Sequence, residues 1–426
     1  MSHATVASSA HQDPSDGRSL EVRCCIAGGG PAGMMVGLLL ARAGVDVIVL
    51  EKHADFLRDF RGDTIHPSTL EIIHELGLLP DLLHRSHQEV QTLSGQIGST
   101  VVQFADFSRL STHCKFIALM PQWDFLDFLA DHARRYPTFK LLMEAEVTDL
   151  LRDGERVVGA VAATRQGRTE IRADLVIGAD GRHSLTRARG ALEVVDVGAP
   201  IDVLWMRISR QPSDPDRTFG RIEAGRMFVM INRSDYWQCA FVIPKGAFST
   251  VQQRGLEAFR TEIARLCPYL GDRVGELRDW RDIKLLTVTV DRLRQWYRPG
   301  LLCIGDAAHA MSPVGGVGIN LAIQDAVASA NILAAPLRAG SVSLDHLRQV
   351  QRRRELPTRL TQRLQVFIQN RVISRVLRST APLSPPWPVR LAQRWPALQR
   401  IPARIVGIGF RPEHVRTPEL ASRRAS

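Results

Sequence analysis

The sequence has little that would place it in a membrane, a secretory class or a metal-binding class. No run of about eighteen apolar residues occurs, because the most apolar segment, residues 34–50, is interrupted by Arg42 and Asp46, so a transmembrane helix is not expected. The six cysteines form no C-x-x-C pair and no Cys/His cluster at zinc-ligand spacing, which predicts reduced structural thiols and no metal site. Residues 1–20 are polar without a secretory pattern, so we expect a disordered leader and a cytoplasmic protein.

Positive charge is concentrated at one end of the chain. The formal net charge is +11, and the residues from Pro336 onward contain eighteen Arg and four Asp or Glu, a balance of +14 that leaves the first 335 residues near −3. No nucleic-acid-binding motif accompanies this tail, so nucleic acid is not an expected partner. We expect a basic helical region at residues 336–426 whose arginine face is solvated, with peripheral membrane contact as the less favoured alternative.

The clearest pattern lies at residues 21–52. An apolar strand leads into the turn GGGPAG, an apolar helix follows, and a second strand ends at Glu51. Gly28, Gly30 and Gly33 form G-x-G-x-x-G: the first permits a tight turn, the second lets backbone N–H groups approach a pyrophosphate, and the third allows close helix–strand packing. Glu51 can accept hydrogen bonds from a ribose diol. The alternative is a βαβ unit that binds nothing, with Glu51 as a solvated strand end.

Other polar residues follow predicted strands. A loop with Arg58, Arg61, Asp63 and His66 comes after the second strand, at the sheet edge where open α/β folds bind ligands. Arg61 is a candidate phosphate or cofactor contact, with a surface ion pair as the alternative. Behind this loop, Ser68 and Glu71 have capping-box spacing, which predicts a helix over residues 69–76.

A later strand, at residues 301–304, opens into a glycine-rich loop that begins near Asp306 and ends near Gly318. The composition of residues 320–337 predicts a helix, and N–H groups at its start would favour an anionic group in the loop.

The pattern of strands and helices predicts an α/β fold with three parts. Residues 21–190 and 291–335 would form a discontinuous Rossmann-like dinucleotide-binding domain, residues 191–290 an inserted, sheet-rich substrate domain, and residues 336–426 a helical C-terminal tail. Predicted strands at residues 203–208, 227–231 and 236–243 carry the second domain.

Three separated segments resemble the signature stretches of the single-component FAD-dependent aromatic hydroxylases, the family of p-hydroxybenzoate hydroxylase. They are GGGPAG with Glu51, GADGRHSLTR at residues 178–187 and GDAAHAMSPVGGVGINLA at residues 305–322. The third is the most specific, and the resemblance covers roughly residues 20–335. It implies that the ADP half of FAD is bound by Gly28, Gly30, Pro31, Ala32, Gly33 and Glu51.

The resemblance implies further cofactor contacts. Arg61 and Gln122 match positions that contact the cofactor from the substrate-side loops. Asp180 belongs to a motif that serves both FAD and the nicotinamide nucleotide, and Asp306 would meet the ribityl chain. Over the flavin ring, the contacts would come from Pro313 and the backbone of Gly318, Ile319 and Asn320. These last donors would stabilise negative charge at N1 and O2 of the reduced flavin.

The activity that the resemblance implies is hydroxylation of an aromatic or polycyclic small molecule by O₂ and NADH or NADPH, through a flavin C4a-hydroperoxide. Only one G-x-G-x-x-G is present, which argues against disulfide-reductase-like flavoproteins. A reductase or dehydrogenase of a lipophilic substrate and a non-enzymatic flavin-binding scaffold stay open, as do monomer and homodimer. The halogenase signature W-x-W-x-I is absent, and no base for deprotonating a phenol is evident from the sequence.

Overall fold

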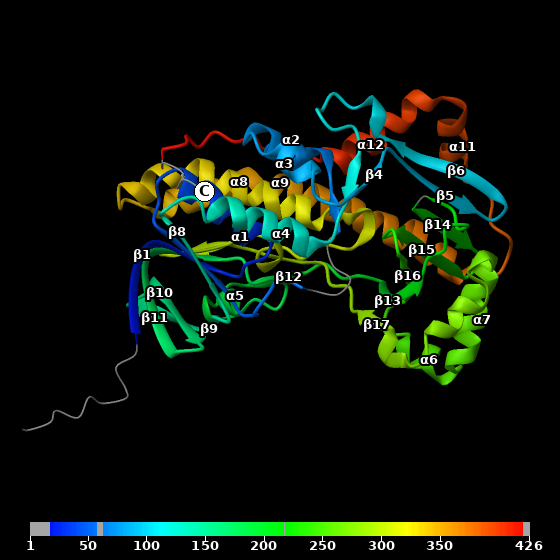
Figure 1. Ribbon diagram of the computed structural model, residues 1–426, viewed down its shortest axis with the longest axis horizontal. Helices are drawn as coiled ribbons and strands as arrows, with labels where there is room; N and C mark the ends of the chain where they lie inside the picture. Colours follow the sequence, from blue (N-terminus) through cyan, green and yellow to red (C-terminus); the bar gives the residue numbers. More distant parts are fainter. Residues whose placement is uncertain (1–17, 58–62, 217, 421–426) are drawn as a thin grey trace, which may run out of the picture.

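The computed structural model describes residues 18–57, 63–216 and 218–420 of the chain. The protein is built on two sheets, with long helices lying along the first and continuing toward the second (Figure 1). Strand β1 begins at Arg18, so residues 18–20 of the expected leader belong to this strand; residues 1–17 lie outside the described part.

The first sheet has eight strands within the described residues, in the order β19-β20-β11-β1-β2-β8, with β10 and β9 continuing antiparallel from β11. The strands are β1 (Arg18–Ala27), β2 (Val47–Glu51), β8 (Phe139–Met143), β9 (Glu146–Asp153), β10 (Arg156–Thr164), β11 (Gly167–Gly178), β19 (Tyr297–Arg298) and β20 (Leu301–Cys303). Strands β20, β11, β1, β2 and β8 run parallel and are mostly buried, as expected for strands covered on both faces. The predicted βαβ unit and the hairpin turns at Asp153-Gly154 and Gln166-Gly167 are confirmed.

Apolar helices fill the core beside this sheet. They are α1 (Pro31–Arg42), α4 (Gln122–Ala133), α8 (Gly318–Arg338) and α9 (Leu344–Ile368), and α1 packs against α4 and α8, while α8 packs against α9 (Figure 1). The predicted helix at residues 320–337 is confirmed as α8. By length and composition the stretch Val314–Arg338 could cross a membrane, but 78% of its apolar window is buried inside the protein. Packing in the core therefore accounts for its apolar character.

The second sheet has seven strands in the described chain, in the order β17-β13-β16-β15-β14-β5-β6. They are β5 (Thr92–Ile97), β6 (Thr100–Asp106), β13 (Ile201–Ser209), β14 (Phe219–Glu223), β15 (Arg226–Asn232), β16 (Tyr236–Pro244) and β17 (Lys284–Leu286). Helices α6 (Phe248–Gln253) and α7 (Leu256–Leu266) cover one face, where Trp237, Phe241 and Phe259 are buried. The predicted strands of the second domain are confirmed, and the β5–β6 hairpin joins their sheet from outside residues 191–290.

Smaller elements connect the two sheets. Strands β3 (Thr64–Ile65), β4 (Gln88–Val90) and β7 (Ile117–Leu119) form one ribbon, and β12 (Val194–Asp196) pairs with β18 (Asp291–Leu293). Short helices are α2 (Pro67–Glu75), α3 (Leu79–Leu83) and α5 (Leu185–Arg189). The predicted capping box at Ser68 and Glu71 is wrong. Pro67, which favours the first helical position, starts α2 earlier, so Ser68 lies inside the helix and Glu71 accepts a hydrogen bond from His113 N instead.

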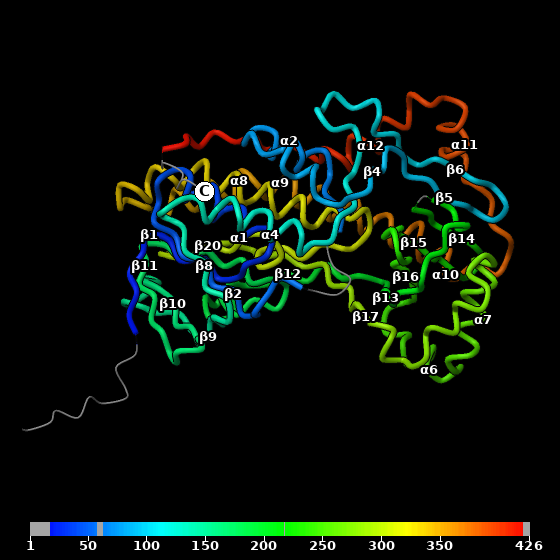
Figure 2. The backbone as a smooth tube through the Cα atoms, in the orientation of Figure 1, coloured from blue at the N-terminus to red at the C-terminus, as the bar shows by residue number. Residues whose placement is uncertain are grey.

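The C-terminal region is helical and comes after the strands of both sheets in the chain. Helix α9 passes through a π-helical turn (Gln369–Ile373) into α10 (Ser374–Arg378), and α11 (Trp387–Arg394) and α12 (Arg400–Gly407) come after it. The chain then returns across the molecule to the end of α1, where Leu420 N donates to Arg42 O at 3.0 Å (Figure 2).

Candidate functional site

The turns that carry the predicted site residues lie at one edge of the first sheet. Ala27 at the end of β1 pairs with Leu50 of β2 and with Gly178 of β11, and Gly178 pairs with Cys303 of β20. These parallel strands therefore end side by side. The structure brings together the segments that follow them, which contain Gly28, Glu51, Asp180 and Asp306.

At two of the three motif positions a neighbouring backbone carbonyl lies so close that only glycine fits. Gly28 has φ of +103°, and a Cβ there would stand 2.4 Å from Ala179 O. A Cβ on Gly33 would stand 1.9 Å from Gly28 O. Gly30 differs, because a Cβ there would meet no protein atom within 4 Å. The space beside Gly30 is open, as binding of a pyrophosphate at this turn requires.

Helix α1 presents its positive end to that space. Gly30 is the N-cap and makes no side-chain cap hydrogen bond, and Pro31 occupies the first turn without an N–H. The N–H groups of Ala32 and Gly33 precede the first intrahelical bond, which Met34 N makes to Gly30 O at 2.9 Å. Donors of this kind, with the helix dipole behind them, suit the phosphates of a dinucleotide.

Glu51 is held in place by backbone donors. Its side chain is buried at the end of β2, and its two carboxylate oxygens accept from Gly29 N at 2.9 Å and from His53 N at 3.1 Å. These two bonds fix the orientation of the carboxylate at the edge of the sheet.

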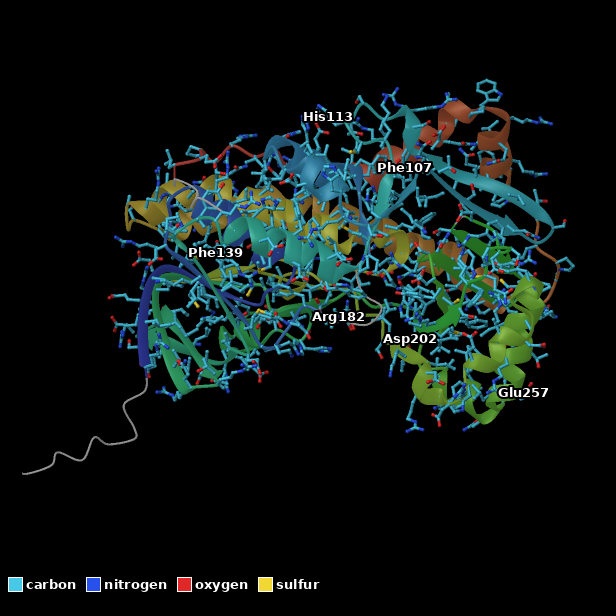
Figure 3. The ribbon with its side chains drawn as sticks, viewed as in Figure 1. Phe107, His113, Phe139, Arg182, Asp202 and Glu257 are labelled. Carbon is cyan, nitrogen blue, oxygen red and sulfur yellow. The ribbon has the colours of Figure 1, made fainter. Side chains whose placement is uncertain are left out.

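The second and third signature stretches meet through an ion pair. Arg182 Nη2 lies 3.4 Å from Asp306 Oδ2. In Figure 3, Arg182 lies near the middle of the molecule, between the labelled Phe139 of β8 and Glu257 of α7. Asp180 is engaged locally: it accepts from Ser184 Oγ at 2.6 Å and from Thr186 N at 2.9 Å, at the start of α5. Its contact with a cofactor stays a prediction.

The loop before α8 is tied to the β3 segment by Asn320. Its Oδ1 accepts from His66 N at 2.9 Å and from Thr69 Oγ1 at 2.7 Å, and Thr64 Oγ1 donates to Gly316 O at 2.9 Å. The Asn320 Oδ1 is thus used in hydrogen bonds within the protein. Helix α8 has no side-chain cap at Val317, so the N–H groups of its first turn, on Gly318, Ile319 and Asn320, are those that a ligand in front of the loop would meet.

Pro313 and Gln122 flank this loop in different ways. Pro313 is the N-cap of the 3₁₀ turn Val314–Gly316 and is half-buried. Gln122 begins α4, and its backbone N–H donates to Asp63 Oδ1 at 3.3 Å. Arg61, the remaining predicted contact, lies outside the described residues.

Sequence reasoning missed a buried polar cluster at the junction of the two sheets. Asp63 Oδ2 lies 2.6 Å from Arg233 Nη2, both side chains are less than 10% exposed, and Arg233 Nε donates to Gln238 Oε1 at 3.0 Å. Burial raises the pKa of Asp63, and the neighbouring Arg233, Gln238 and Gln122 offset this only in part. Arg233 and Gln238 have no motif around them, so nothing in the sequence pointed to their partner.

A second buried cluster lies behind the signature loop. Asp325 of α8 is fully buried. Its Oδ2 lies 2.5 Å from His309 Nε2 and 3.1 Å from Gly305 N, and its Oδ1 lies 3.0 Å from Arg354 Nε. Burial alone would raise the pKa of Asp325, but His309 and Arg354 outweigh it and hold this pKa below its usual value. The acid within the apolar helical run AIQDAV was a signal that could have indicated this cluster.

The chain is similar to known proteins in sequence and in fold. Residues 21–364 match the family model described as FAD binding domain. A 6-methylpretetramide 4-monooxygenase from Streptomyces rimosus is 32% identical over 399 residues, which cover 92% of this chain and 93% of that relative.

Two solved structures show the same fold. PqsL from Pseudomonas aeruginosa, in complex with 2-aminobenzoylacetate, has a TM-score of 0.73 at 21% identity and covers 84% of this chain and 98% of its own. The OxyS anhydrotetracycline hydroxylase from Streptomyces rimosus has a TM-score of 0.70 at 21% identity, covering 91% and 76%. The resemblance seen in the three motifs is confirmed: this chain belongs to the FAD binding domain family, that of the FAD-dependent aromatic hydroxylases, and is an FAD-dependent monooxygenase.

Proposed function

We propose that the protein hydroxylates an aromatic or polycyclic small molecule with O₂, using NADH or NADPH to reduce its FAD. The observation that carries this proposal is the meeting of all three signature stretches at one edge of the first sheet. The relative named 6-methylpretetramide 4-monooxygenase supports an aromatic or polycyclic substrate.

The residues at this edge fit FAD. The open space beside Gly30, the first turn of α1 and the carboxylate of Glu51 would hold the ADP half, with Asp306 toward the ribityl chain. Arg61, Gln122, Asp180 and Pro313 stay proposed contacts. When bound, FAD supplies the redox chemistry that activates O₂ for transfer to the substrate.

The chain's own contribution is charge stabilisation and positioning. The first N–H groups of α8 would stabilise negative charge on a ligand lying in front of the loop, because a helix N-terminus favours anions. The bonds from Asn320 and Thr64 hold that loop against β3, so the donors are oriented before a ligand arrives.

A buried apolar cluster of the second sheet, next to the signature loop, supports the substrate class. On the face opposite α6 and α7, Val203 and Val242 pack with Val314 of the loop and with partly buried Trp205. The buried Trp205 Nε1 has no hydrogen-bond partner in the described chain. Because Val314 belongs to the loop in front of which the ligand is proposed to lie, an aromatic ring system bound there would border this apolar cluster.

The test is turnover with isotopically labelled O₂. We expect the purified protein to contain one non-covalent FAD and to oxidise NADH or NADPH faster when a suitable phenolic polycycle is added. Product formed under heavy-isotope O₂ should gain one labelled oxygen atom, because one atom enters the product and the other leaves as water. Substrate conversion without label would contradict the hydroxylase and favour a reductase or dehydrogenase.

A further inference from the structure

The C-terminal arm, defined here as α11, the 3₁₀ turn Pro396–Gln399 and α12, has an unusual charge pattern. Residues 356–412, which include it, contain ten Arg and no Lys, Asp or Glu. In Figure 1 the arm lies at the upper right, beside strand β6, which it contacts through both helices. The arm is therefore a purely cationic segment fixed to the edge of the second sheet.

Helix α11 is held to β6 by one side chain. Gln393 Nε2 donates to Gln103 O at 2.7 Å, and Gln393 Oε1 accepts from Gln103 N at 3.3 Å. At about 100° per residue, Trp387, Leu391 and Trp395 fall about 120°, 160° and 200° around the helix from Gln393. The contact through Gln393 thus turns an apolar stripe away from the body of the protein.

The exposure of these side chains agrees with that geometry. Trp387 is 68% exposed, Leu391 41% and Trp395 65%. On α12, Ala403 and Gly407 pack inward, and a Cβ on Gly407 would be 3.1 Å from the Phe107 ring, whereas Ile401 is 57% exposed. Both helices therefore have a fixed inner face and an outer face with large apolar side chains.

Four arginines accompany the outer face: Arg390, Arg394, Arg400 and Arg404. All four are exposed, and none of their side chains makes an ion pair or hydrogen bond with the part of the chain that the structure describes. Two exposed Trp, exposed Leu and Ile, and unpaired Arg on short helices are the composition of helices that lie in the interface of a bilayer.

We propose that the arm docks on the surface of a bilayer rich in anionic phospholipid. Trp387, Leu391, Trp395 and Ile401 would enter the headgroup region, and the four arginines would contact lipid phosphates. Charge complementarity favours this occupant over a second copy of the chain. Two copies meeting through their arms would bring eight unpaired arginines together at an apolar contact, where like charges repel.

The experiment is co-sedimentation of the FAD-loaded full chain with phosphatidylcholine vesicles, with and without phosphatidylglycerol. Binding is expected only with phosphatidylglycerol and should weaken as salt rises, because charges are screened over about 10 Å at 0.1 M. Brominated lipid should quench part of the Trp fluorescence, and this quenching should be lost in the double variant Trp387→Ser, Trp395→Ser.

Matched variants separate the arm from general surface charge and apolarity. The double variant Arg390→Gln, Arg394→Gln should weaken binding roughly fivefold per arginine, whereas Arg254→Gln, an exposed arginine beyond α6, should leave it unchanged. The Trp double variant should lower binding about tenfold or more, and Leu285→Ser, on the exposed part of β17, should not. FAD content should be equal in all variants.

Three results would overturn the proposal. The first is absence of vesicle binding at low salt. The second is binding to a nucleic acid duplex that the same arginine substitutions abolish while vesicle binding persists. The third is self-association of the wild-type chain in solution that the Trp substitutions abolish, which would assign the apolar stripe to a second copy.

Discussion

The residues at the edge of the first sheet and those at its junction with the second sheet are held in place by different means. At the edge of the eight-stranded sheet the backbone itself comes into contact, with no room for a Cβ on Gly28 or Gly33. At the junction with the seven-stranded sheet, side chains make the contacts, through Asp63, Arg233 and Gln238. The first site therefore depends on residue types that a sequence displays directly, whereas the cluster at the junction depends on pairings that any of several residues could make.

The largest expected effect compares the two buried carboxylates. Asp325→Asn should lower the free energy of unfolding by roughly 3–5 kcal/mol, because it removes the buried negative charge that both His309 and Arg354 contact and leaves Arg354 with only the longer pair to Glu413, at 3.4 Å. Asp63→Asn also removes the partner of a buried arginine, Arg233, but should cost less, roughly 1–3 kcal/mol. The pKa of Asp63 is raised by burial whereas that of Asp325 is lowered by its partners, so the charged form of Asp63 is the less stabilised of the two. Urea unfolding of both variants gives the two values, and equal losses would remove the distinction between the clusters.

The next prediction separates the two roles of glycine within one motif. Gly33→Ala should destabilise the fold by about 1–3 kcal/mol, since its Cβ would stand 1.9 Å from Gly28 O and the turn must shift. Gly30→Ala should leave the unfolding of the FAD-free protein unchanged and weaken FAD binding, because its Cβ would occupy only the open space beside α1. If Gly30→Ala lowers the stability of the FAD-free protein, protein atoms and not the cofactor occupy the space beside Gly30, and the proposed role of this space is contradicted.

A third prediction concerns Glu51, the acceptor proposed to bind the ribose. Glu51→Ala should weaken FAD binding by about 1.5–3 kcal/mol through loss of hydrogen bonds to a buried charged group. Glu51→Gln keeps acceptor oxygen for Gly29 N and should weaken it less. Reconstitution of the FAD-free variants, followed by flavin fluorescence, measures both affinities. Unchanged affinity in Glu51→Ala would contradict the role proposed for this residue.

The smallest effect is a pH dependence that arises at the junction. His66 is fully buried, its Nδ1 lies 2.7 Å from Val406 O, and burial lowers its pKa from 6.5 to about 4. Since the unfolded chain takes up this proton first, its contribution is fully present above pH 6.5 and is lost as the pH falls toward 4. Between pH 7 and pH 5 the stability should fall by about 2 kcal/mol.

The matched control for this pH effect is His66→Gln, which has no titrating ring. Its urea unfolding should show less of the decline between pH 7 and pH 5, although other groups titrate in both proteins. If wild type and variant lose equal stability over this range, His66 is not the source.

The fold and the first site could largely be predicted from the sequence. Gly28, Gly33 and Glu51 stand at fixed spacing within one continuous βαβ unit, where local geometry restricts the residue types and no distant partner is needed. Other predictions failed or were incomplete because packing decided them. The start of α2 moved to Pro67, and β5 and β6 joined a sheet whose other strands lie about a hundred residues later in the chain.

By itself the sequence determined that a dinucleotide-binding turn, a second signature turn and a glycine-rich loop exist, and that the C-terminal region is cationic. Only the tertiary structure decided which side chains meet across the chain: Arg182 with Asp306, Arg233 with Asp63, Arg354 with Asp325, and Gln393 with the backbone of Gln103. The physical reason is that backbone constraints act over a few neighbouring residues and restrict the residue type at each of them. A buried ion pair requires only that two oppositely charged side chains come together in space. Since the two residues can be far apart in the chain, no local sequence pattern identifies the pair.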